Sequence, residues 1–338
     1  MKSWQFAAFG IENLKLVERP APTPRPGHVV VDVRAFSLNY RDLLMVTGRY
    51  NPKLALPATP ISDAAAVVSA VGEGVTRWKV GDHVISHFAA DWINGPFRSE
   101  YTKTSLGCPG PGLAAEQVEL PAHALVPMSA ATGDWHEAAT LPIAALTAWS
   151  SLFQVGALAP GQTVLTLGTG GVSIFAVQFA RATGARVIIT SSSDAKLERA
   201  KALGADEGVN YRSTPKWDDA VLALTDGRGA DVVVENGGAG TLNQSMRATK
   251  PAGRVAILGA LTGLQAEINT GLILMKRLTL GGVYVDCRDE FERMNRFIGQ
   301  HSIRPVIDRV FPFEEFPEAL RTMARGDHFG KIVVSRTS

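Results

Sequence analysis

One stretch of the chain, residues 161–194, constrains the fold more than any other. It opens with a short apolar run, Thr163–Leu167, which has the length of a buried β-strand. A turn rich in glycine follows directly, with glycine at positions 168, 170 and 171. Because glycine has no side chain, such a turn lets the backbone come close to a ligand.

A helix and a second strand complete this pattern. Apolar residues after the turn recur at the spacing of one helix face, namely Val172, Phe175, Ala176, Phe179 and Ala180. Gly184 stands where a helix C-cap would fall, and the β-branched residues 186–190 indicate the next strand. The stretch therefore predicts a βαβ unit with glycines at its first turn.

A helix N-terminus beside a glycine turn offers unpaired N–H groups and the positive end of a dipole to a pyrophosphate. The G-x-G-x-x-G pattern is incomplete here, because Ser173 stands where the third glycine belongs. That position allows close packing of helix on strand, and serine is small enough to serve. We therefore predict a dinucleotide site, with cofactor-binding residues Gly168, Thr169, Gly170, Gly171 and Val172.

Composition is that of a globular protein. The 338 residues suffice for two domains, with 46% hydrophobic and 20% charged residues. A formal net charge of +2 indicates no nucleic-acid partner. Two cysteines, Cys108 and Cys287, form neither a disulfide framework nor a metal-cluster spacing. We see no secretory signal and no run long enough to span a bilayer, so we expect a soluble cytoplasmic protein without a membrane partner.

The rest of the chain contains two kinds of pattern. Residues 1–128 read as short strands separated by Gly and Pro, which is typical of a barrel-like β domain. Residues 129–286 alternate strands with helices, which predicts an α/β domain with a doubly wound parallel sheet. Residues 287–338 are expected to return to the first domain. The predicted strands cover residues 4–9, 14–18, 28–37, 64–71, 80–88, 163–167, 186–190, 209–211, 231–235, 254–258, 278–285 and 331–334, and the predicted helices cover 41–47, 136–154, 172–183, 196–203, 242–248, 288–301 and 314–324.

The chain resembles the medium-chain dehydrogenase/reductase superfamily, in its zinc-free branch of quinone oxidoreductase-like enzymes. The resemblance implies a GroES-like β-barrel catalytic domain, a Rossmann domain and an active cleft between them. It depends on segments that run from end to end: Ser37-Leu-Asn-Tyr-Arg-Asp42, Val71-Gly-Glu-Gly-Val75, Val80-Gly-Asp-His-Val84, Ala138-Ala-Thr-Leu-Pro142, Leu146-Thr-Ala-Trp149, the glycine turn, Ala202-Leu-Gly-Ala-Asp206 and Phe329-Gly-Lys-Ile-Val333.

The resemblance also predicts that no metal is bound. Zinc-dependent relatives have a cysteine where Asn39 stands and Gly-His-Glu at positions 61–63, which here are Ile-Ser-Asp. Asp63 alone cannot hold a zinc ion that needs several nitrogen or sulfur ligands. The structural-zinc loop of these relatives has four close cysteines, whereas residues 87–112 contain only Cys108.

His83 and His87 have the i, i+4 spacing that would chelate zinc on a helix. The local pattern is that of a strand, which would separate them by roughly 13 Å. We therefore expect ordinary strand histidines that do not share an ion.

The choice of nicotinamide cofactor depends on the end of the second strand, where NAD-selective Rossmann folds carry an acid. Here Ser192 and Ser193 follow that strand, while Lys196 and Tyr211 match positions that hold the 2′-phosphate in NADPH-dependent relatives. Hydroxyls, a cation and a phenol suit a phosphate, so we expect NADP(H). Two alternatives stay open. Asp194 is an acid near this strand end and could favour NAD(H), and the serines could simply cap a helix.

The resemblance assigns further residues to the cofactor and to the chemistry. Asn39 matches the asparagine beside the nicotinamide, and Thr147 matches the threonine at the reactive end of the cofactor. Tyr50 matches the proton donor of enoyl thioester reductases in this branch, with pocket lining as the alternative, and Tyr40 is a weaker candidate. Three residues near the ends of the fourth and fifth Rossmann strands complete the expected cofactor site, namely Gly237, Leu258 and Gly259.

These observations favour an NADPH-dependent, zinc-independent oxidoreductase that transfers hydride to quinones or conjugated carbonyls of small molecules. Alcohol oxidation is the alternative within enzymes, although it would lack its Lewis acid. A nucleotide-binding protein with little turnover is the alternative outside enzymes. The apolar residues 278–285 would form an exposed sheet edge, so we expect a homodimer joined there.

Overall fold

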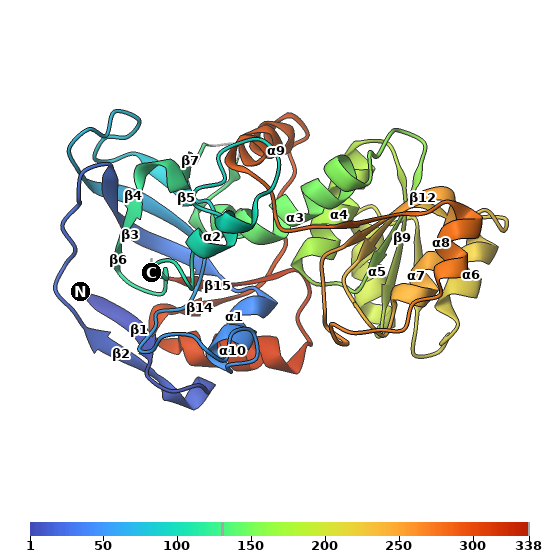
Figure 1. Cartoon of the computed structure of the whole chain (residues 1–338), viewed down its shortest axis with the longest axis horizontal. Helices are drawn as coiled ribbons and strands as arrows, with labels where there is room; N and C mark the ends of the chain where they lie inside the picture. Colours follow the sequence, from blue (N-terminus) through green and yellow to red (C-terminus); the bar gives the residue numbers. More distant parts are fainter. Residues whose placement is uncertain (130–131, 337–338) are drawn as a thin grey trace. The chain divides into compact units, whose positions relative to one another are not determined.

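The structure, a computed structural model, describes residues 1–129 and 132–336, and the chain divides into two compact units (Figure 1). Unit 1 contains Met1–Leu146 and Val285–Ser338, and unit 2 contains Thr147–Tyr284. The pattern-based domain boundaries lie instead at 128/129 and 286/287. The difference at the first boundary arises because helix α2 (Trp135–Ala139) packs on strands β3 and β4 of unit 1.

Unit 1 is built on a seven-stranded sheet of order β14-β15-β3-β4-β5-β7, with β6 also paired to β3, and on the antiparallel hairpin β1–β2. The barrel-like β domain is therefore confirmed. The strands are β1 (Lys2–Phe6), β2 (Leu14–Glu18), β3 (His28–Ser37), β4 (Asp63–Val71), β5 (His83–Ser86), β6 (Gln117–Pro121), β7 (Leu125–Pro127), β14 (Ile307–Pro312) and β15 (Lys331–Ser335).

The C-terminal segment completes unit 1. In Figure 1 the red strands β14 and β15 lie beside the blue strand β3, and β15 is the strand that joins them. The core is aromatic where these segments meet: the rings of Phe36 and Phe316 lie edge to face with centroids 5.3 Å apart. The indole nitrogen of Trp4 donates a hydrogen bond of 2.9 Å to the carbonyl of Phe313. Residues from both ends of the chain thus form one core.

Unit 2 is built on a six-stranded sheet of order β10-β9-β8-β11-β12-β13, in which every neighbouring pair is parallel. Numbered from β8, the order is 3-2-1-4-5-6, which is the Rossmann order. The predicted doubly wound sheet is therefore confirmed. The strands are β8 (Thr163–Leu167), β9 (Arg186–Ser191), β10 (Glu207–Asn210), β11 (Ala230–Glu235), β12 (Thr249–Ile257) and β13 (Thr279–Gly282).

Helices cover the sheets of both units. Beside α2, unit 1 carries α1 (Tyr40–Val46), α9 (Arg288–Gln300), α10 (Phe316–Arg325), the short turns η1 (Ile11–Asn13), η2 (Ser99–Thr104), η3 (Ala122–Ala124) and η7 (Phe313–Glu315), and the π-helical η5 (Leu141–Ala145). Unit 2 carries the π-helical η6 (Ser150–Val155), α4 (Gly171–Ala182), α5 (Asp194–Ala202), α6 (Trp217–Leu224), α7 (Leu242–Ala248) and α8 (Thr270–Lys276). The chain crosses from unit 1 to unit 2 within α3 (Leu146–Trp149).

The helix predicted over residues 136–154 is divided into α2, η5, α3 and η6. Its apolar face is nevertheless buried as expected, at Ala138, Leu141, Ala145, Ala148 and Leu152. The 3–4 spacing alone does not distinguish α-helical from π-helical turns, because both put these side chains toward the core.

Among the described residues, no helix is both long and apolar enough to cross a membrane.

Candidate functional site

The glycine turn of unit 2 presents open backbone at the end of β8. Gly168 has a φ of 75°, in the left-handed region that favours glycine, and Gly170 is the N-cap of α4. A Cβ atom added at either glycine would meet no other heavy atom within 4 Å. This open space lies before the first turn of a twelve-residue helix, whose leading N–H groups have no partner within the helix. The turn therefore fits a pyrophosphate.

Ser173 takes a defined part in this turn. Its hydroxyl donates a hydrogen bond of 2.7 Å to the carbonyl of Leu167, the last residue of β8. The side-chain amide of Asn236 donates to the same hydroxyl at 2.8 Å and to the same carbonyl at 3.1 Å. The serine that replaces the third glycine therefore joins β8, α4 and the loop after β11.

The buried carboxylate of Glu235 organises the loop that carries Gly237. One carboxylate oxygen accepts hydrogen bonds from the backbone N–H groups of Gly237 and Gly238, at 2.7 and 2.9 Å, and from the hydroxyl of Thr241, at 2.6 Å. The hydroxyl of Ser245 donates to the other oxygen. Sequence reasoning did not identify this residue, which fixes the backbone on which a predicted cofactor contact depends.

Leu258 and Gly259 lie directly beside that loop. Their backbone N–H groups donate to the carbonyl of Glu235 at 3.2 and 3.3 Å. A Cβ atom at Gly259 would lie only 1.9 Å from the carbonyl oxygen of Asn236, so only glycine fits this close approach. Strands β8, β11 and β12 run parallel as neighbours. The predicted residues at 168–172, 237 and 258–259 therefore lie together at the carboxyl ends of these strands.

The serines after β9 also lie at the carboxyl ends of the strands, next to the end of β10. The hydroxyl of Ser193 caps α5 by accepting a hydrogen bond from the N–H of Lys196 at 3.4 Å. The N–H of Tyr211 donates to the carbonyl of Ser191 at 3.0 Å, which brings the tyrosine to the serine turn. Strand β10 ends at Asn210, so Tyr211 lies in the following turn rather than in the predicted strand, and it is exposed.

Asp194 is engaged by a neighbour. Its carboxylate accepts a hydrogen bond of 2.8 Å from the side-chain amide of Asn210. Thr147, the remaining predicted contact in unit 2, is buried in α3, and its carbonyl accepts a hydrogen bond from Ser151. Unit 2 therefore offers open backbone and hydroxyl-bearing residues at the carboxyl ends of its strands, and this set fits a nicotinamide dinucleotide.

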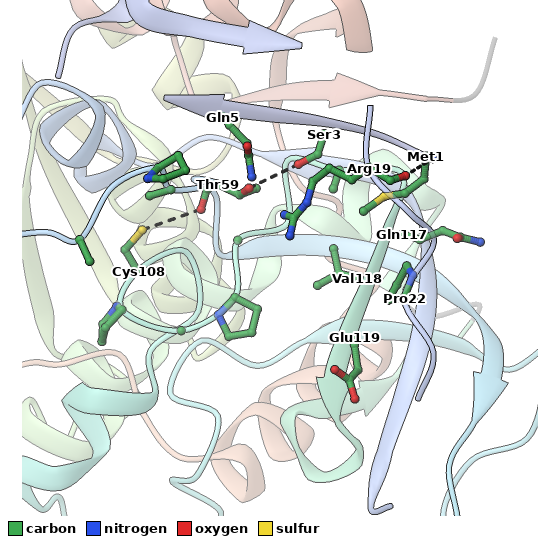
Figure 2. A pocket seen from close by; sticks show the side chains of 18 of the residues that line it. Met1, Ser3, Gln5, Arg19, Pro22, Thr59, Cys108, Gln117, Val118 and Glu119 are labelled. Carbon is green, nitrogen blue, oxygen red and sulfur yellow. Dashed lines mark hydrogen bonds between the residues drawn. The ribbon is translucent and has the colours of Figure 1, made fainter. Parts of the chain in front are cut away.

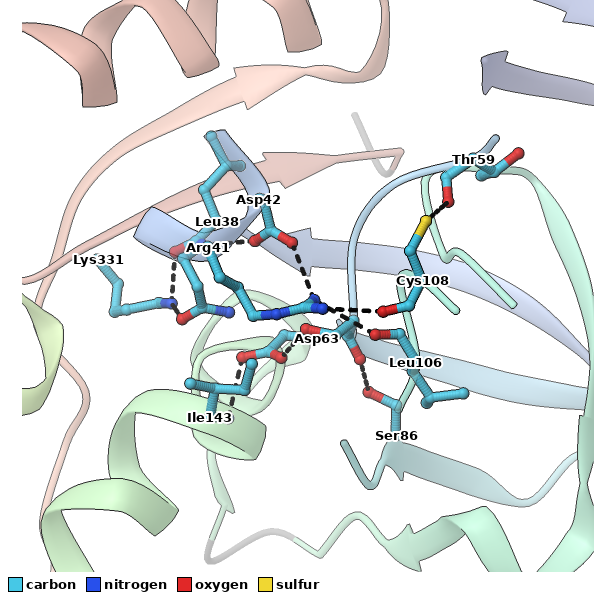
Figure 3. A network of polar contacts seen from close by, with 12 residues as sticks. Leu38, Arg41, Asp42, Thr59, Asp63, Ser86, Leu106, Cys108, Ile143 and Lys331 are labelled. Atoms are coloured by element: carbon cyan, nitrogen blue, oxygen red, sulfur yellow. Dashed lines mark hydrogen bonds and ion pairs between the residues drawn. The ribbon is translucent and has the colours of Figure 1, made fainter. Parts of the chain in front are cut away.

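A buried polar cluster lies in unit 1 where α1 begins. Asn39 is the N-cap of α1, and its N–H donates to the carboxylate of Asp42 at 2.7 Å. The guanidinium of Arg41 donates to the carbonyls of Leu106 and Cys108, at 3.3 and 3.0 Å, and lies 3.7 Å from the Asp42 carboxylate (Figure 3). Asp42 therefore caps its helix, and Arg41 ties that helix to the loop around residue 108.

Lys331 and Asp63 complete the cluster. The Lys331 ammonium donates to the carbonyl of Leu38 at 2.6 Å and to the side-chain oxygen of Asn39 at 2.7 Å. The Asp63 carboxylate accepts from the hydroxyl of Ser62 at 2.7 Å and from the N–H of Ile143 at 3.0 Å. With Arg41 and Asp42, the cluster holds two buried carboxylates and two cations, so its formal charges cancel.

Burial dominates the electrostatics of this cluster. It raises the pKa of Asp42 to about 6, with the nearby Arg41 guanidinium opposing the shift. It also raises the pKa of Asp63, against the attraction of Lys331, and lowers the pKa of Lys331, against the attraction of Asp63 and Asp42. Burial raises the pKa of the Cys108 thiol to about 11, which keeps it protonated and poorly nucleophilic.

The predicted tyrosines lie at the two ends of α1. Tyr40 is the first residue of the helix and is partly exposed. Tyr50 follows the helix and is 48% exposed, and the Arg41 guanidinium lies 5.2 Å from the centre of its ring. Such cation–π contacts stabilise by about 0.5–1 kcal/mol at exposed sites, so Arg41 holds the ring while leaving its hydroxyl accessible. Arg41 thus links Tyr50 to the polar cluster.

The cluster does not fit zinc. Among residues 1–129 and 132–336, no group of three or more His, Cys, Asp or Glu side chains is placed to hold a metal ion. Asn39 contributes a neutral amide that is already bonded to Lys331, and both nearby carboxylates face cations. Zinc prefers several thiolate or imidazole ligands, and the ammonium would repel it.

The two histidines of the candidate pair have different environments. His83 is exposed in β5, and its ring lies against that of Trp135, with centroids 4.5 Å apart. His87 follows β5 and is fully buried, with its Nε2 at 3.2 Å from the carbonyl of Trp92. This burial lowers the pKa of His87 to about 3, so the ring is neutral in the folded protein.

A separate groove of about 1020 Å³ also lies in unit 1 (Figure 2). Its walls come from β1, the segment around residues 57–59 and the segment 108–112, with Arg19 and Glu119 among the lining side chains. None of the predicted site residues lines it. We therefore do not assign the candidate chemistry to this groove.

A GroES-like β unit and a Rossmann unit in one chain define an oxidoreductase that uses a nicotinamide cofactor. A family model described as an alcohol dehydrogenase GroES-like domain matches residues 25–130, and one described as a zinc-binding dehydrogenase matches residues 171–300. The chain belongs to the medium-chain dehydrogenase/reductase superfamily. The zinc-binding description attaches to a match that contains neither Asn39 nor residues 61–63.

Several relatives match along nearly the whole chain. A zinc-type alcohol dehydrogenase-like protein of Schizosaccharomyces pombe is 40% identical over 96% of both chains. A solved structure from Sinorhizobium meliloti 1021, described as a candidate alcohol dehydrogenase, has a TM-score of 0.92 at 41% identity and covers 99% of this chain and 98% of its own. An NAD-dependent alcohol dehydrogenase has a TM-score of 0.90 at 34% identity, and a quinone oxidoreductase of Pseudomonas syringae has 0.84 at 27%, each over 99% of both chains.

The buried His87 gives a prediction about acid stability. The unfolded chain takes up a proton at this residue below about pH 6.5, whereas the folded chain does not until about pH 3, so stability falls as the pH drops through this window. Between pH 6.5 and pH 5 the loss should be about 2 kcal/mol. His87→Gln, which stays neutral, should remove this contribution. The change in stability between the two pH values, measured by urea unfolding, should therefore differ between parent and variant by about 2 kcal/mol.

Asp42 acts in the opposite sense over part of the same range, because the folded protein holds its proton up to about pH 6. Its contribution is common to both proteins and cancels in the comparison. Equal pH dependence in the parent protein and in His87→Gln would contradict the prediction.

Proposed function

We propose that this protein is a zinc-independent, NADPH-dependent oxidoreductase that transfers hydride to quinones or conjugated carbonyls. The observation that carries the proposal is the charge-balanced cluster of Asn39, Arg41, Asp42, Asp63 and Lys331. Two of its members, Asn39 and Asp63, stand at positions where the resemblance puts metal-site residues of zinc-dependent relatives. The zinc-dependent route of alcohol oxidation uses a Lewis acid at the oxygen, and this cluster has no donor set for one. Reduction of an activated C=C bond needs only hydrogen-bond donors and a proton source.

When bound to unit 2, the cofactor would supply a hydride to the β-carbon of the substrate. Negative charge would then develop on the carbonyl oxygen, which would need a hydrogen-bond donor, and Asn39 is our candidate from the resemblance. A proton must finally reach the α-carbon or the oxygen, and Tyr50 is our candidate donor.

The direct test is a panel of quinones, enones, enoyl thioesters and alcohols, followed by NADPH or NADH absorbance, with metal analysis of the same purified protein. We expect turnover on the quinones or the conjugated carbonyls and no tightly bound zinc. About one zinc per chain, together with activity on alcohols alone, would favour the alcohol dehydrogenase that several relatives are named for.

We further propose that unit 2 prefers NADPH. Support comes from Ser192, Ser193, Lys196 and the exposed Tyr211, whose backbones lie at the ends of β9 and β10. NAD(H) is the alternative cofactor, because one relative of similar fold is described as NAD-dependent. Asp194 is the acid that would bind the ribose of NAD(H).

Substitution of Lys196 tests this preference. Lys196→Ala should weaken NADPH binding by about one to two decades and NADH binding far less, because a charge-assisted bond to the 2′-phosphate contributes roughly 1.5–3 kcal/mol. Fluorescence titration with both cofactors measures the difference, and Lys201→Ala, a lysine paired with Glu198 on the same helix, is the matched control. Equal affinity of the parent protein for both cofactors would refute the assignment.

Tyr50 is proposed as the proton donor because of its accessible hydroxyl and its anchoring by Arg41. Tyr50→Phe keeps the ring and removes only the hydroxyl, so NADPH should still bind. Turnover of an enone or enoyl thioester should fall at least tenfold, since general acid catalysis contributes about two to four decades. Quinone reduction should fall less, because quinones can take protons from water. Undiminished turnover on every substrate would contradict the proposal and leave Tyr50 as pocket lining.

We also propose that the protein is a homodimer joined through β13. This strand lies at the end of the unit 2 sheet, and Leu264, Leu274 and Met275 in the segment before it are strongly exposed. Gly282→Lys puts a charge on this edge at a position where a Cβ has open space, so the variant should fold and become monomeric. Light scattering at micromolar concentration measures the mass. Ser213→Lys, which adds the same charge after β10, is the control. A monomeric parent protein would rule the proposal out.

A further inference from the structure

The sequence contains two Asn-Gly pairs, Asn94-Gly95 and Asn236-Gly237. In such a pair the backbone nitrogen of glycine can attack the side-chain carbonyl carbon of asparagine, because glycine has no side chain to hinder the approach. The attack releases ammonia and changes the asparagine permanently. It requires that the asparagine side chain can move and that the glycine N–H is not engaged elsewhere, so the fold decides whether each pair reacts.

The first pair lies in an irregular loop of unit 1, between strand β5 and the turn η2. Both Asn94 and Gly95 are exposed. In the described part of the chain, the Asn94 side chain and the Gly95 N–H have no hydrogen-bond partner. An exposed loop without such bonds changes its conformation at little cost. Both reacting groups of this pair are therefore free.

The second pair is held at both of its reacting groups. The side-chain nitrogen of Asn236 donates to the carbonyl of Leu167 at 3.1 Å and to the hydroxyl of Ser173 at 2.8 Å. The N–H of Gly237 donates to the carboxylate of Glu235 at 2.7 Å. The attacking nitrogen has to lose this proton, and its loss beside a carboxylate would bring two negative charges together. The fold therefore opposes the reaction at this pair.

We propose that Asn94 is a site of spontaneous deamidation in the folded protein, whereas Asn236 is protected by the fold. The Gly95 nitrogen forms a bond to Cγ of Asn94, the bond from Cγ to Nδ2 breaks, and ammonia leaves with the proton of the Gly95 amide. Water then opens the cyclic imide at either carbonyl, which gives aspartate or isoaspartate. The step needs neither an oxidant nor a reductant, and it is independent of the proposed hydride transfer.

The modification changes a loop that is anchored at Trp92. Both products add a negative charge at position 94, and isoaspartate also lengthens the main chain before Gly95. The indole nitrogen of Trp92 donates to the carbonyl of Gly95 at 2.9 Å, and its ring stacks on that of Tyr101 with centroids 5.8 Å apart. The carbonyl of Trp92 accepts a hydrogen bond of 2.9 Å from the N–H of Arg288. Isoaspartate should therefore displace the Gly95 carbonyl from the indole and loosen the loop.

Ageing of the purified protein at neutral and at mildly alkaline pH tests the proposal, with peptide mapping by mass spectrometry at both asparagines. Asn94 should react at least about tenfold faster than Asn236, because the bond from Gly237 to a charged acceptor must break first. The rate at Asn94 should rise with pH, since the attacking nitrogen has to lose its proton. Equal rates at the two asparagines of the folded protein would overturn the inference.

The same protein unfolded in urea is the matched control for the role of the fold. Unfolding removes the hydrogen bonds of Asn236 and Gly237 but leaves both Asn-Gly sequences intact. The two asparagines should therefore react at similar rates in urea. If Asn236 stays as slow in urea as in the folded protein, its protection comes from the neighbouring sequence and the inference fails.

Two variants at position 94 separate the site from its effect on the loop. Asn94→Gln would have to close a larger ring, so it should lack the slow acidic shift that isoelectric focusing detects in the aged parent protein. An equal acidic shift in aged Asn94→Gln would place the modification elsewhere and overturn the inference. Asn94→Asp has the charge of the product with a normal main chain, so trypsin should cleave after the exposed Arg98 faster in the aged parent protein than in Asn94→Asp. Equal cleavage would overturn the predicted loosening of the loop.

Discussion

The burial of four charges at the beginning of α1 is the constraint on which unit 1 depends. Arg41 and Asp42 can pair within α1, whereas Asp63 of β4 and Lys331 of β15 are neutralised only when these elements meet. A buried charge without its partner costs several kcal/mol, which makes the meeting of these elements close to obligatory. The same requirement places Asn39 within the cluster, with its side-chain oxygen bonded to Lys331 and its N–H bonded to Asp42.

Most elements of unit 2 could be predicted because their sequence patterns are local, although the helices α6 and α8 were missed. Strand β8, the glycine turn and α4 follow one another without interruption, and the parallel order of the sheet follows from the βα repeats. The serine at position 173 was expected to fit by size alone. Its bonds to Leu167 and Asn236 could not be predicted, because Asn236 is more than sixty residues away in the sequence.

The cluster in unit 1 was predictable only in part. Asn39 and Asp63 were located through the resemblance, which describes lost zinc ligands and not what replaced them. The single charged residue in the apolar strand β15 could have indicated that Lys331 has a buried partner. That partner could not be identified from the sequence, because it lies almost 300 residues earlier. The role of Glu235 could not be predicted for a related reason. A carboxylate at a strand end gives no sequence signal that four hydrogen-bond donors contact it. Strand β14 was missed because this edge strand alternates poorly and carries two charged residues, Asp308 and Arg309.

The place of β15 has a consequence for the order in which the molecule is assembled during synthesis. Residues 147–284 leave the ribosome as one uninterrupted segment with a complete parallel sheet, so unit 2 can fold as soon as it emerges. Unit 1 begins the chain, yet its sheet lacks the strand between β14 and β3, and its cluster lacks a cation, until residue 331 has been made. The first unit in the sequence is therefore the last to mature, and until then Asp63 and Asp42 must stay hydrated.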